Sequence, residues 1–164
     1  MPFIEVLAKL KADWKTLCAG KGGHCPVCDR YGRDYGRALN RSMAKSLIWL
    51  AHAKRDHARW VDVPKESPRW LVRTNQLPSL RWWGLVERHP NLPGHNKTKF
   101  SGLWRPTELG MKFVAGEVDV PRTAITYAGE VLAMAEDDRV KISDCFKTVF
   151  DYEQIMDNPI NQPD

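Results

Sequence analysis

Two short segments, about twenty residues apart, constrain the fold of this chain more than any other feature of its sequence. The first is GLVE at 84–87, where a glycine can end a helix and the following residues alternate as a strand. The second is WRPTELG at 104–110, which ends a returning strand and offers Thr107 as the N-cap of a helix. The polar stretch at 90–99 between them contains prolines and a glycine, as loops do. Together these signals predict a helix, a β-hairpin and another helix in succession.

The residues before 84 supply further helices that could pack on such a hairpin. Apolar residues at helical spacing predict a long helix over 38–59, and 60–64 is a short extended piece that ends at a proline. A Ser-Pro pair opens a helix over 67–75, with the serine as N-cap and the proline at the first helical position. A further short helix over 76–83 carries Pro78 in its first turn. The predicted order is therefore helix, short strand, two helices, hairpin and helix.

This order and the two joint segments resemble the winged helix-turn-helix family of DNA-binding proteins. Members of that family show a Leu-rich helix end, Gly-Leu-Val/Ile-Glu, a wing, and then a hydrophobic-x-Leu-Thr-x-x-Gly motif that opens a helix. The positions that match by type and spacing are Leu80, Gly84, Leu85, Val86, Thr107 and Gly110. The chain departs from the pattern at Pro106 and at Pro78, which shortens the recognition helix. The whole chain also resembles phage and prophage proteins with a CPxC motif ahead of such a domain, a likeness that supplies no activity.

We expect a mainly α fold with a small β content (α+β), in which a winged helix-turn-helix has an N-terminal helical arm and a C-terminal hairpin plus helix. The winged-helix domain covers 37–117, preceded by a helical arm and CxxC knuckle at 1–36. A β-hairpin and an acidic C-terminal helix follow at 118–164. The arm is an amphipathic helix over 3–18, and the glycines of 29–37 predict a loop there.

The charge of the chain is divided unevenly along its length. Lys and Arg number 25 against 20 Asp and Glu, a net charge of +5. Residues 1–123 hold 22 bases and 11 acids, a net of +11, whereas residues 124–164 hold 3 bases and 9 acids, a net of −6. A basic body suggests a polyanionic partner, and a solvated basic surface is the plainer interpretation. The acidic tail could fold back on the body, dimerise through its helix, bind a host protein or imitate DNA.

The resemblance implies that the helix near 76–83 reads the major groove and that 90–99 forms the wing. Asn and Gln side chains can bind adenine with two hydrogen bonds, and Arg suits guanine or phosphate. The candidate DNA-contacting residues are Arg69, Arg73, Asn75, Gln76, Ser79, Arg81, Lys97 and Lys99. The same residues could instead form a solvated helix face or a surface that docks a protein.

The CPVC motif at Cys25 and Cys28 is the half-site found in zinc ribbons and knuckles, because two intervening residues let both sulfurs reach one tetrahedral ion. Cys18 is our candidate for a third ligand, since the glycine run at 20–23 could fold it back; the fourth ligand stays open. One structural zinc ion would then join the arm to the winged-helix domain. A pair of reduced thiols and a redox pair are the alternatives. For Cys145 we expect a buried, inert thiol.

No catalytic motif occurs in the sequence, so we expect no enzyme. No apolar run is long enough to cross a bilayer and the N-terminus lacks a signal-peptide pattern, so we expect a cytoplasmic protein without a membrane partner. The function that these observations favour is a DNA-binding protein, a phage-type regulator of transcription or replication whose partner is double-stranded DNA. The alternative is a docking or inhibitory module that binds a host protein.

Overall fold

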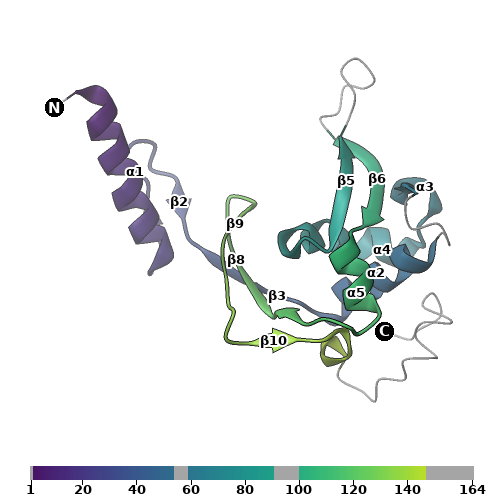
Figure 1. Cartoon of the computed structure of the whole chain (residues 1–164). Helices are drawn as coiled ribbons and strands as arrows, with labels where there is room; N and C mark the ends of the chain where they lie inside the picture. The colour runs from purple at the N-terminus through teal and green to yellow at the C-terminus, as the bar shows by residue number, and fades with distance from the viewer. Residues whose placement is uncertain (1, 54–58, 91–99, 147–164) are drawn as a thin grey trace. The chain divides into compact units, whose positions relative to one another are not determined.

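The computed structural model describes residues 2–53, 59–90 and 100–146, and the chain divides into two compact units (Figure 1). Unit 1 comprises residues 1–37 and 123–135, and unit 2 comprises residues 38–122 and 136–164. The sequence analysis assigned the hairpin after residue 122 to a C-terminal segment at 118–164, whereas the structure groups this hairpin with the N-terminal arm.

The fold class is α+β, and the expectation of a mainly α fold with little β structure is wrong. Helices account for 45% and strands for 27% of the residues that the structure describes. These strands form four sheets. Part of the difference comes from 29–37, expected as a loop, where Tyr31–Gly32 and Tyr35–Ala38 are strands. Tyrosine favours strands, and Gly32 lets the chain approach Trp14 so closely that a Cβ there would lie 2.5 Å from the indole ring.

Unit 1 combines one long helix with two small antiparallel sheets. A two-stranded sheet pairs β1 with β2, and a three-stranded sheet has the order β3-β8-β9. Left-handed backbone at Ala128 and Gly129 forms the turn between β8 and β9, which confirms the predicted hairpin near Gly129. The elements are α1 (Phe3–Ala19), β1 (Gly23–His24), β2 (Tyr31–Gly32), β3 (Tyr35–Ala38), β8 (Thr123–Tyr127) and β9 (Glu130–Met134).

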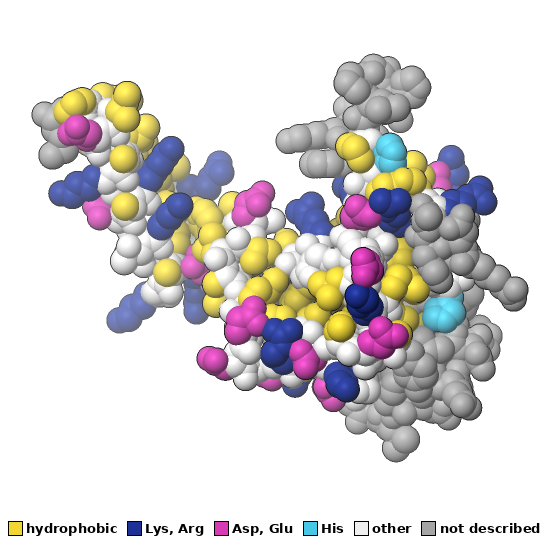
Figure 2. All heavy atoms as spheres, viewed as in Figure 1, with side chains coloured by type: hydrophobic (Ala, Val, Ile, Leu, Met, Phe, Trp, Pro, Cys, Tyr) yellow, Lys and Arg dark blue, Asp and Glu magenta, His cyan; other side chains and the backbone are white. Residues whose placement is uncertain are grey.

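Helix α1 confirms the helix predicted over 3–18, but its apolar side is largely open. Phe3 and Ile4 are exposed, and Cys18 is the buried residue of the helix. The indole Nε1–H of Trp14 donates a 2.9 Å hydrogen bond to the hydroxyl of Tyr127 on β8, which ties the helix to the three-stranded sheet. Figure 2 shows lysine and arginine side chains along this helix and apolar side chains near its N-terminal end.

Unit 2 has the element order that was predicted for 38–116, with one short helix at 63–66 that was not predicted. A three-stranded antiparallel sheet has the order β4-β6-β5, in which β5 and β6 form the hairpin. The elements are α2 (Arg41–Ala53), β4 (Val61–Asp62), α3 (Val63–Glu66), α4 (Arg69–Thr74), η1 (Leu77–Trp83), β5 (Val86–Pro90), β6 (Phe100–Pro106), α5 (Glu108–Val114), β7 (Val120–Pro121), β10 (Arg139–Val140) and η2 (Ile142–Cys145).

Helix α2 forms the centre of unit 2. Every residue from Met43 to Ala51 is buried, so the helix is covered on all sides rather than along one stripe. It begins at Arg41, later than the predicted Ala38, where the Asn40 side chain accepts a 3.0 Å hydrogen bond from the backbone N–H of Met43. Residues 54–58, the predicted end of this helix, lie outside the described residues.

Two other predicted boundaries shift by small amounts. Helix α4 begins at Arg69 with Pro68 at the N-cap, and Ser67, the predicted cap, makes no capping hydrogen bond. Pro68 has extended backbone geometry, which leaves the serine one position too early to cap the helix. Near the C-terminus, the described part of the predicted acidic helix is the 3-10 turn η2, and residues 147–164 lie outside the described residues.

Candidate nucleic-acid interface

The end of η1 and the start of the β5–β6 hairpin are held at one backbone junction. Gly84 has the left-handed φ of 67° that a helix-ending glycine adopts, as predicted. Gly110 of α5 lies so close to the hairpin that a Cβ there would be 2.0 Å from the carbonyl oxygen of Leu85. The two halves of the sequence signature are therefore in direct contact, which explains their joint spacing.

The residues of η1 follow a period of three, which matches its 3-10 geometry rather than an α-helix. Leu77, Leu80 and Trp83 are buried at this spacing. The Nε1–H of Trp83 also donates a 2.7 Å hydrogen bond to the carbonyl oxygen of Pro121. Trp83 therefore packs inward, whereas its neighbour Trp82 is half-buried. Arg81 is the one exposed residue of η1, so few side chains of this element are left to meet a partner.

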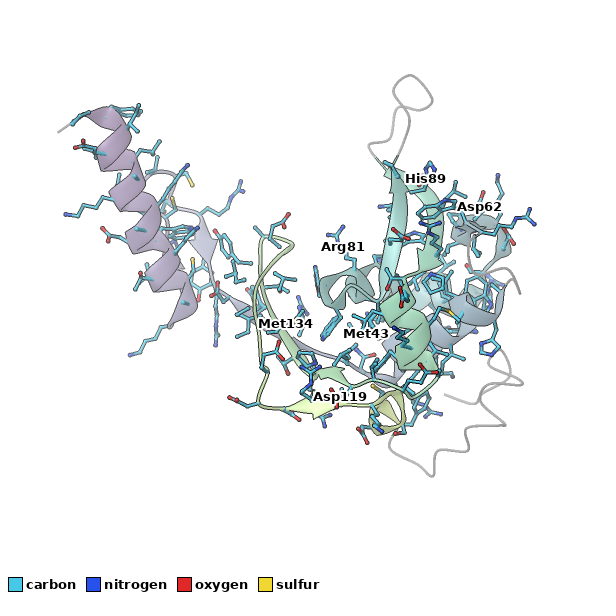
Figure 3. The ribbon with its side chains drawn as sticks, viewed as in Figure 1. Met43, Asp62, Arg81, His89, Asp119 and Met134 are labelled. Carbon is cyan, nitrogen blue, oxygen red and sulfur yellow. The ribbon has the colours of Figure 1, made fainter. Side chains whose placement is uncertain are left out.

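Three arginines lie on the consecutive elements α4 and η1 and are called here the arginine surface: Arg69, Arg73 and Arg81. All three are exposed, and none of them forms an ion pair with a carboxylate among the described residues. Figure 3 shows Arg81 projecting outward from η1. Asn75 is exposed beside these arginines, at the left-handed C-cap of α4 with a φ of 48°.

Five basic side chains elsewhere in unit 2 are paired with neighbouring acids. They lie on α3, β6, α5, β10 and the segment before β8. The pairs are Lys65–Asp62, Arg105–Glu87, Lys112–Glu108, Arg122–Asp138 and Arg139–Asp119. The three arginines of α4 and η1 differ from these five bases in having no such contact among the described residues.

Arg88 on β5 extends the basic region into the hairpin and was missed by the sequence analysis. Its guanidinium lies 5.0 Å from the ring centroid of Trp104, and its Nε–H donates to the carbonyl oxygen of Ser101. Burial, and then the positive charge of Arg81, lower the pKa of the Arg88 guanidinium. Two like charges are therefore held near each other, an arrangement that an anion bound between them would relieve.

A groove of about 770 Å³ lies beside the arginine surface. Its lining residues are Pro64, Ser67, Arg69, Trp70, Val72 and Arg73. The Oγ atom of Ser67 is buried and has no hydrogen-bond partner among the described residues. Two arginines therefore line one concave surface.

The other predicted DNA-contacting residues are either half-buried or lie outside the residues that the structure describes. Gln76 is half-buried at the N-cap of η1, and its Nε2 donates a 3.0 Å hydrogen bond to the carbonyl oxygen of Thr74. Ser79 is half-buried on η1. Lys97 and Lys99 of the predicted wing lie outside the described residues.

The CPVC segment in unit 1 is a tight turn between β1 and β2. The backbone N–H of Cys25 donates to the carbonyl oxygen of Arg30, and the N–H of Asp29 donates to the carbonyl oxygen of Cys25, each at 2.9 Å. Backbone N–H groups of Val27 and Cys28 point at the Cys25 sulfur and lower the pKa of its thiol.

Cys18, the predicted third zinc ligand, is buried, whereas Cys28 in this turn is exposed. Burial is the main cause that raises the pKa of its thiol, and the sulfur lies near the backbone of Gly32. Within the part of the chain that the structure describes, no group of three or more His, Cys, Asp or Glu side chains is arranged to hold a metal ion.

No protein-family model matches this chain, and no curated protein or solved structure matches it significantly. Among the helices of the described residues, none combines the length and apolar character needed to cross a lipid bilayer.

Proposed function

We propose that unit 2 binds double-stranded DNA through the arginine surface, with the β5–β6 hairpin beside it. The observation that carries this proposal is the separation of charges. Arg69, Arg73 and Arg81 have no described carboxylate partner, whereas five described bases on other elements of unit 2 have one. Guanidinium groups without a carboxylate partner suit phosphate oxygens.

The chemistry of the individual side chains assigns them different roles in this proposal. Arg69 and Arg73 line one groove, where two positive charges can hold a phosphate group. Arg81 and Asn75 are exposed near the short η1 and are the side chains best able to reach base edges. Since η1 spans only about 14 Å at about 2.0 Å per residue, we expect most of the affinity to come from the backbone of the duplex.

The resemblance to winged-helix proteins supports a role in the control of transcription or replication, of the kind found in phages. We also propose a cytoplasmic location, since the protein would meet double-stranded DNA there. All four cysteines are free thiols in the structure, which fits a reducing compartment.

The test is duplex binding as a function of salt concentration. Phosphate contacts predict that log affinity falls linearly with log salt, by about 0.9 for each contact. The Arg73→Ala and Arg81→Ala variants should each reduce this slope by about 1 if the residue contacts a phosphate. Lys112→Ala is the matched control, because it removes one positive charge from an ion pair on α5 and should leave the slope unchanged.

The result that would overturn the proposal is the absence of measurable duplex binding at low salt by the folded protein. Equal losses in the Lys112→Ala control and in the arginine variants would also contradict it, because the effect would then follow net charge rather than the arginine surface. If a protein from the host co-purifies and the arginine variants keep it bound, the alternative of a docking or inhibitory module replaces DNA binding.

A further inference from the structure

The CPVC turn presents two sulfurs from one rigid backbone segment. The hairpin β1–β2 pairs Gly23 with Gly32, and the bonds between Cys25, Arg30 and Asp29 close the turn beyond it. Asp29 has a left-handed φ of 57°, which reverses the chain within this short distance. Cys25 and Cys28 therefore lie on one short backbone segment that hydrogen bonds close.

Both sulfurs remain accessible to a partner. Cys28 is exposed, Cys25 is half-buried, and both are free thiols. A structural zinc ion requires four ligands in a tetrahedron, so this turn supplies half of a complete set.

The nearest other ligands in unit 1 are engaged elsewhere. The Nδ1 of His24 lies 2.9 Å from the carbonyl oxygen of Asp29, and its ring packs edge-on against Tyr31. Cys18 is buried beside Gly32, and its pKa is raised by that burial. Among the described residues of unit 1, no third His, Cys, Asp or Glu side chain joins the two thiols in a group that could hold a metal ion.

We propose that two copies of this chain share one zinc ion, each contributing Cys25 and Cys28. A two-fold axis through the metal would bring two identical half-sites together as four sulfur ligands. Two-fold symmetry is the symmetry of most homodimers. Binding replaces the four thiol protons, which pass to the solvent, with four zinc–sulfur bonds and involves no oxidation. The resulting complex carries a charge of about −2, and the exposed Lys21, Arg30 and Arg33 flank the turn to offset it.

The surface around the turn has the apolar character of an interface. Val27, between the two cysteines, is 66% exposed, and Tyr31 and Leu17 are 51% and 45% exposed. A Cβ on Gly23 would lie 2.2 Å from Leu17, so this leucine packs directly on the hairpin that carries the thiols. A second copy seated on the metal would cover this apolar surface, which otherwise meets water. This proposal does not depend on DNA binding by unit 2.

The test uses the full chain, reduced and without a metal-binding tag, titrated with zinc chloride. We expect uptake to stop at one zinc ion per two chains and the mass in solution to double, measured by native mass spectrometry and light scattering. The Cys25→Ser and Cys28→Ser variants should stay monomeric and take up no zinc, with an unchanged circular dichroism spectrum because both positions lie on an accessible turn. Cys18→Ala is the control that should keep the stoichiometry of the wild type.

Three results would overturn the proposal. The first is one zinc ion per monomeric chain, which would mean that ligands from the same chain complete the site. The second is loss of zinc in Cys18→Ala when that variant is folded, which would make Cys18 a ligand. The third is a folded, reduced protein that takes up no zinc at all. Duplex binding should also be measured on Cys25→Ser, so that a failure of the zinc proposal can be told apart from a failure of the DNA-binding proposal.

Discussion

The hydroxyl of Thr107 donates a 2.6 Å hydrogen bond to the carbonyl oxygen of Gly84, which lies 23 residues earlier in the chain. The same hydroxyl accepts a 3.0 Å hydrogen bond from the backbone N–H of Gly110, so Thr107 caps α5 as predicted. The backbone N–H of Thr107 donates to Leu85 at 3.1 Å. One residue therefore joins the end of η1 and the first turn of α5 across the two ends of the β5–β6 hairpin.

Replacing Thr107 with valine should destabilise unit 2 by about 1–2 kcal/mol. Valine keeps the branched shape but removes both hydrogen bonds of the hydroxyl, and the loss of an N-cap alone costs about 1 kcal/mol. Thr107→Ser keeps the hydroxyl and should retain most of the stability. Urea denaturation of the two variants measures the difference, and equal losses in both would show that the methyl group rather than the hydroxyl matters.

Gly110→Ala should cost about 2–4 kcal/mol, although alanine is normally the better helix former by about 1 kcal/mol. The added Cβ would lie 2.0 Å from the carbonyl oxygen of Leu85, so the helix and the hairpin would have to separate. Gly116→Ala is the matched control, because its Cβ would meet no atom within 4 Å and only its φ of 74° is unfavourable. Thermal unfolding of both variants tests this, and a Gly110→Ala variant as stable as Gly116→Ala would contradict the close approach.

The thiol of Cys145 should make the protein less stable at alkaline pH. Burial, with a smaller contribution from Asp144, raises the pKa of this thiol from 9.0 to about 11. Above pH 9 the unfolded chain releases this proton while the folded chain keeps it, so the folded state loses stability as pH rises towards 11.

The free energy of unfolding should therefore fall by at most about 1.4 kcal/mol per pH unit from this group in that range. Cys145→Ala removes the effect, and the difference between its pH profile and that of the wild type isolates the thiol from lysines and tyrosines. Parallel profiles from pH 8 to 11 would mean that the thiol is not held neutral by burial.

Tyr127→Phe should loosen the attachment of α1 to the β3-β8-β9 sheet. The substitution removes the hydroxyl that accepts the 2.9 Å hydrogen bond from Trp14, an interaction worth about 1 kcal/mol. Amide hydrogen exchange in Phe3–Ala19 should then become about fivefold faster, which corresponds to that energy. Tyr31→Phe is the control, because its hydroxyl makes only an exposed 3.3 Å hydrogen bond to Lys21. Unchanged exchange in Tyr127→Phe would show that other contacts hold the helix.

Local signals in the sequence predicted several features that the structure confirms. The glycine that ends η1, the threonine that caps α5 and the turn at Gly129 depend on backbone angles and on hydrogen bonds within a few residues. The helix over 3–18 was likewise predicted from its own spacing of apolar residues. Each of these is decided by the residue itself and its near neighbours.

Features that depend on distant partners were not predicted. Residues 35–37 were expected in a loop because of the glycines of 29–37, yet Tyr35–Ala38 pairs with β8, which lies about ninety residues away, and Thr126 bonds to Tyr35 there. Arg88 seemed an ordinary strand residue, and its proximity to Arg81 appears only when the hairpin returns over η1. The Ser67 cap failed because the backbone of Pro68 already occupies the cap position.

The sequence by itself therefore determined most of the order of elements over 38–116, the threonine cap of α5, the glycine that ends η1 and the division of charge between body and tail, since these are properties of neighbouring residues and of composition. Only the tertiary structure decided which strands pair, which arginines lack a carboxylate partner and which cysteines are accessible. Those outcomes depend on contacts between residues far apart in the chain, and no local pattern records which distant segments will meet.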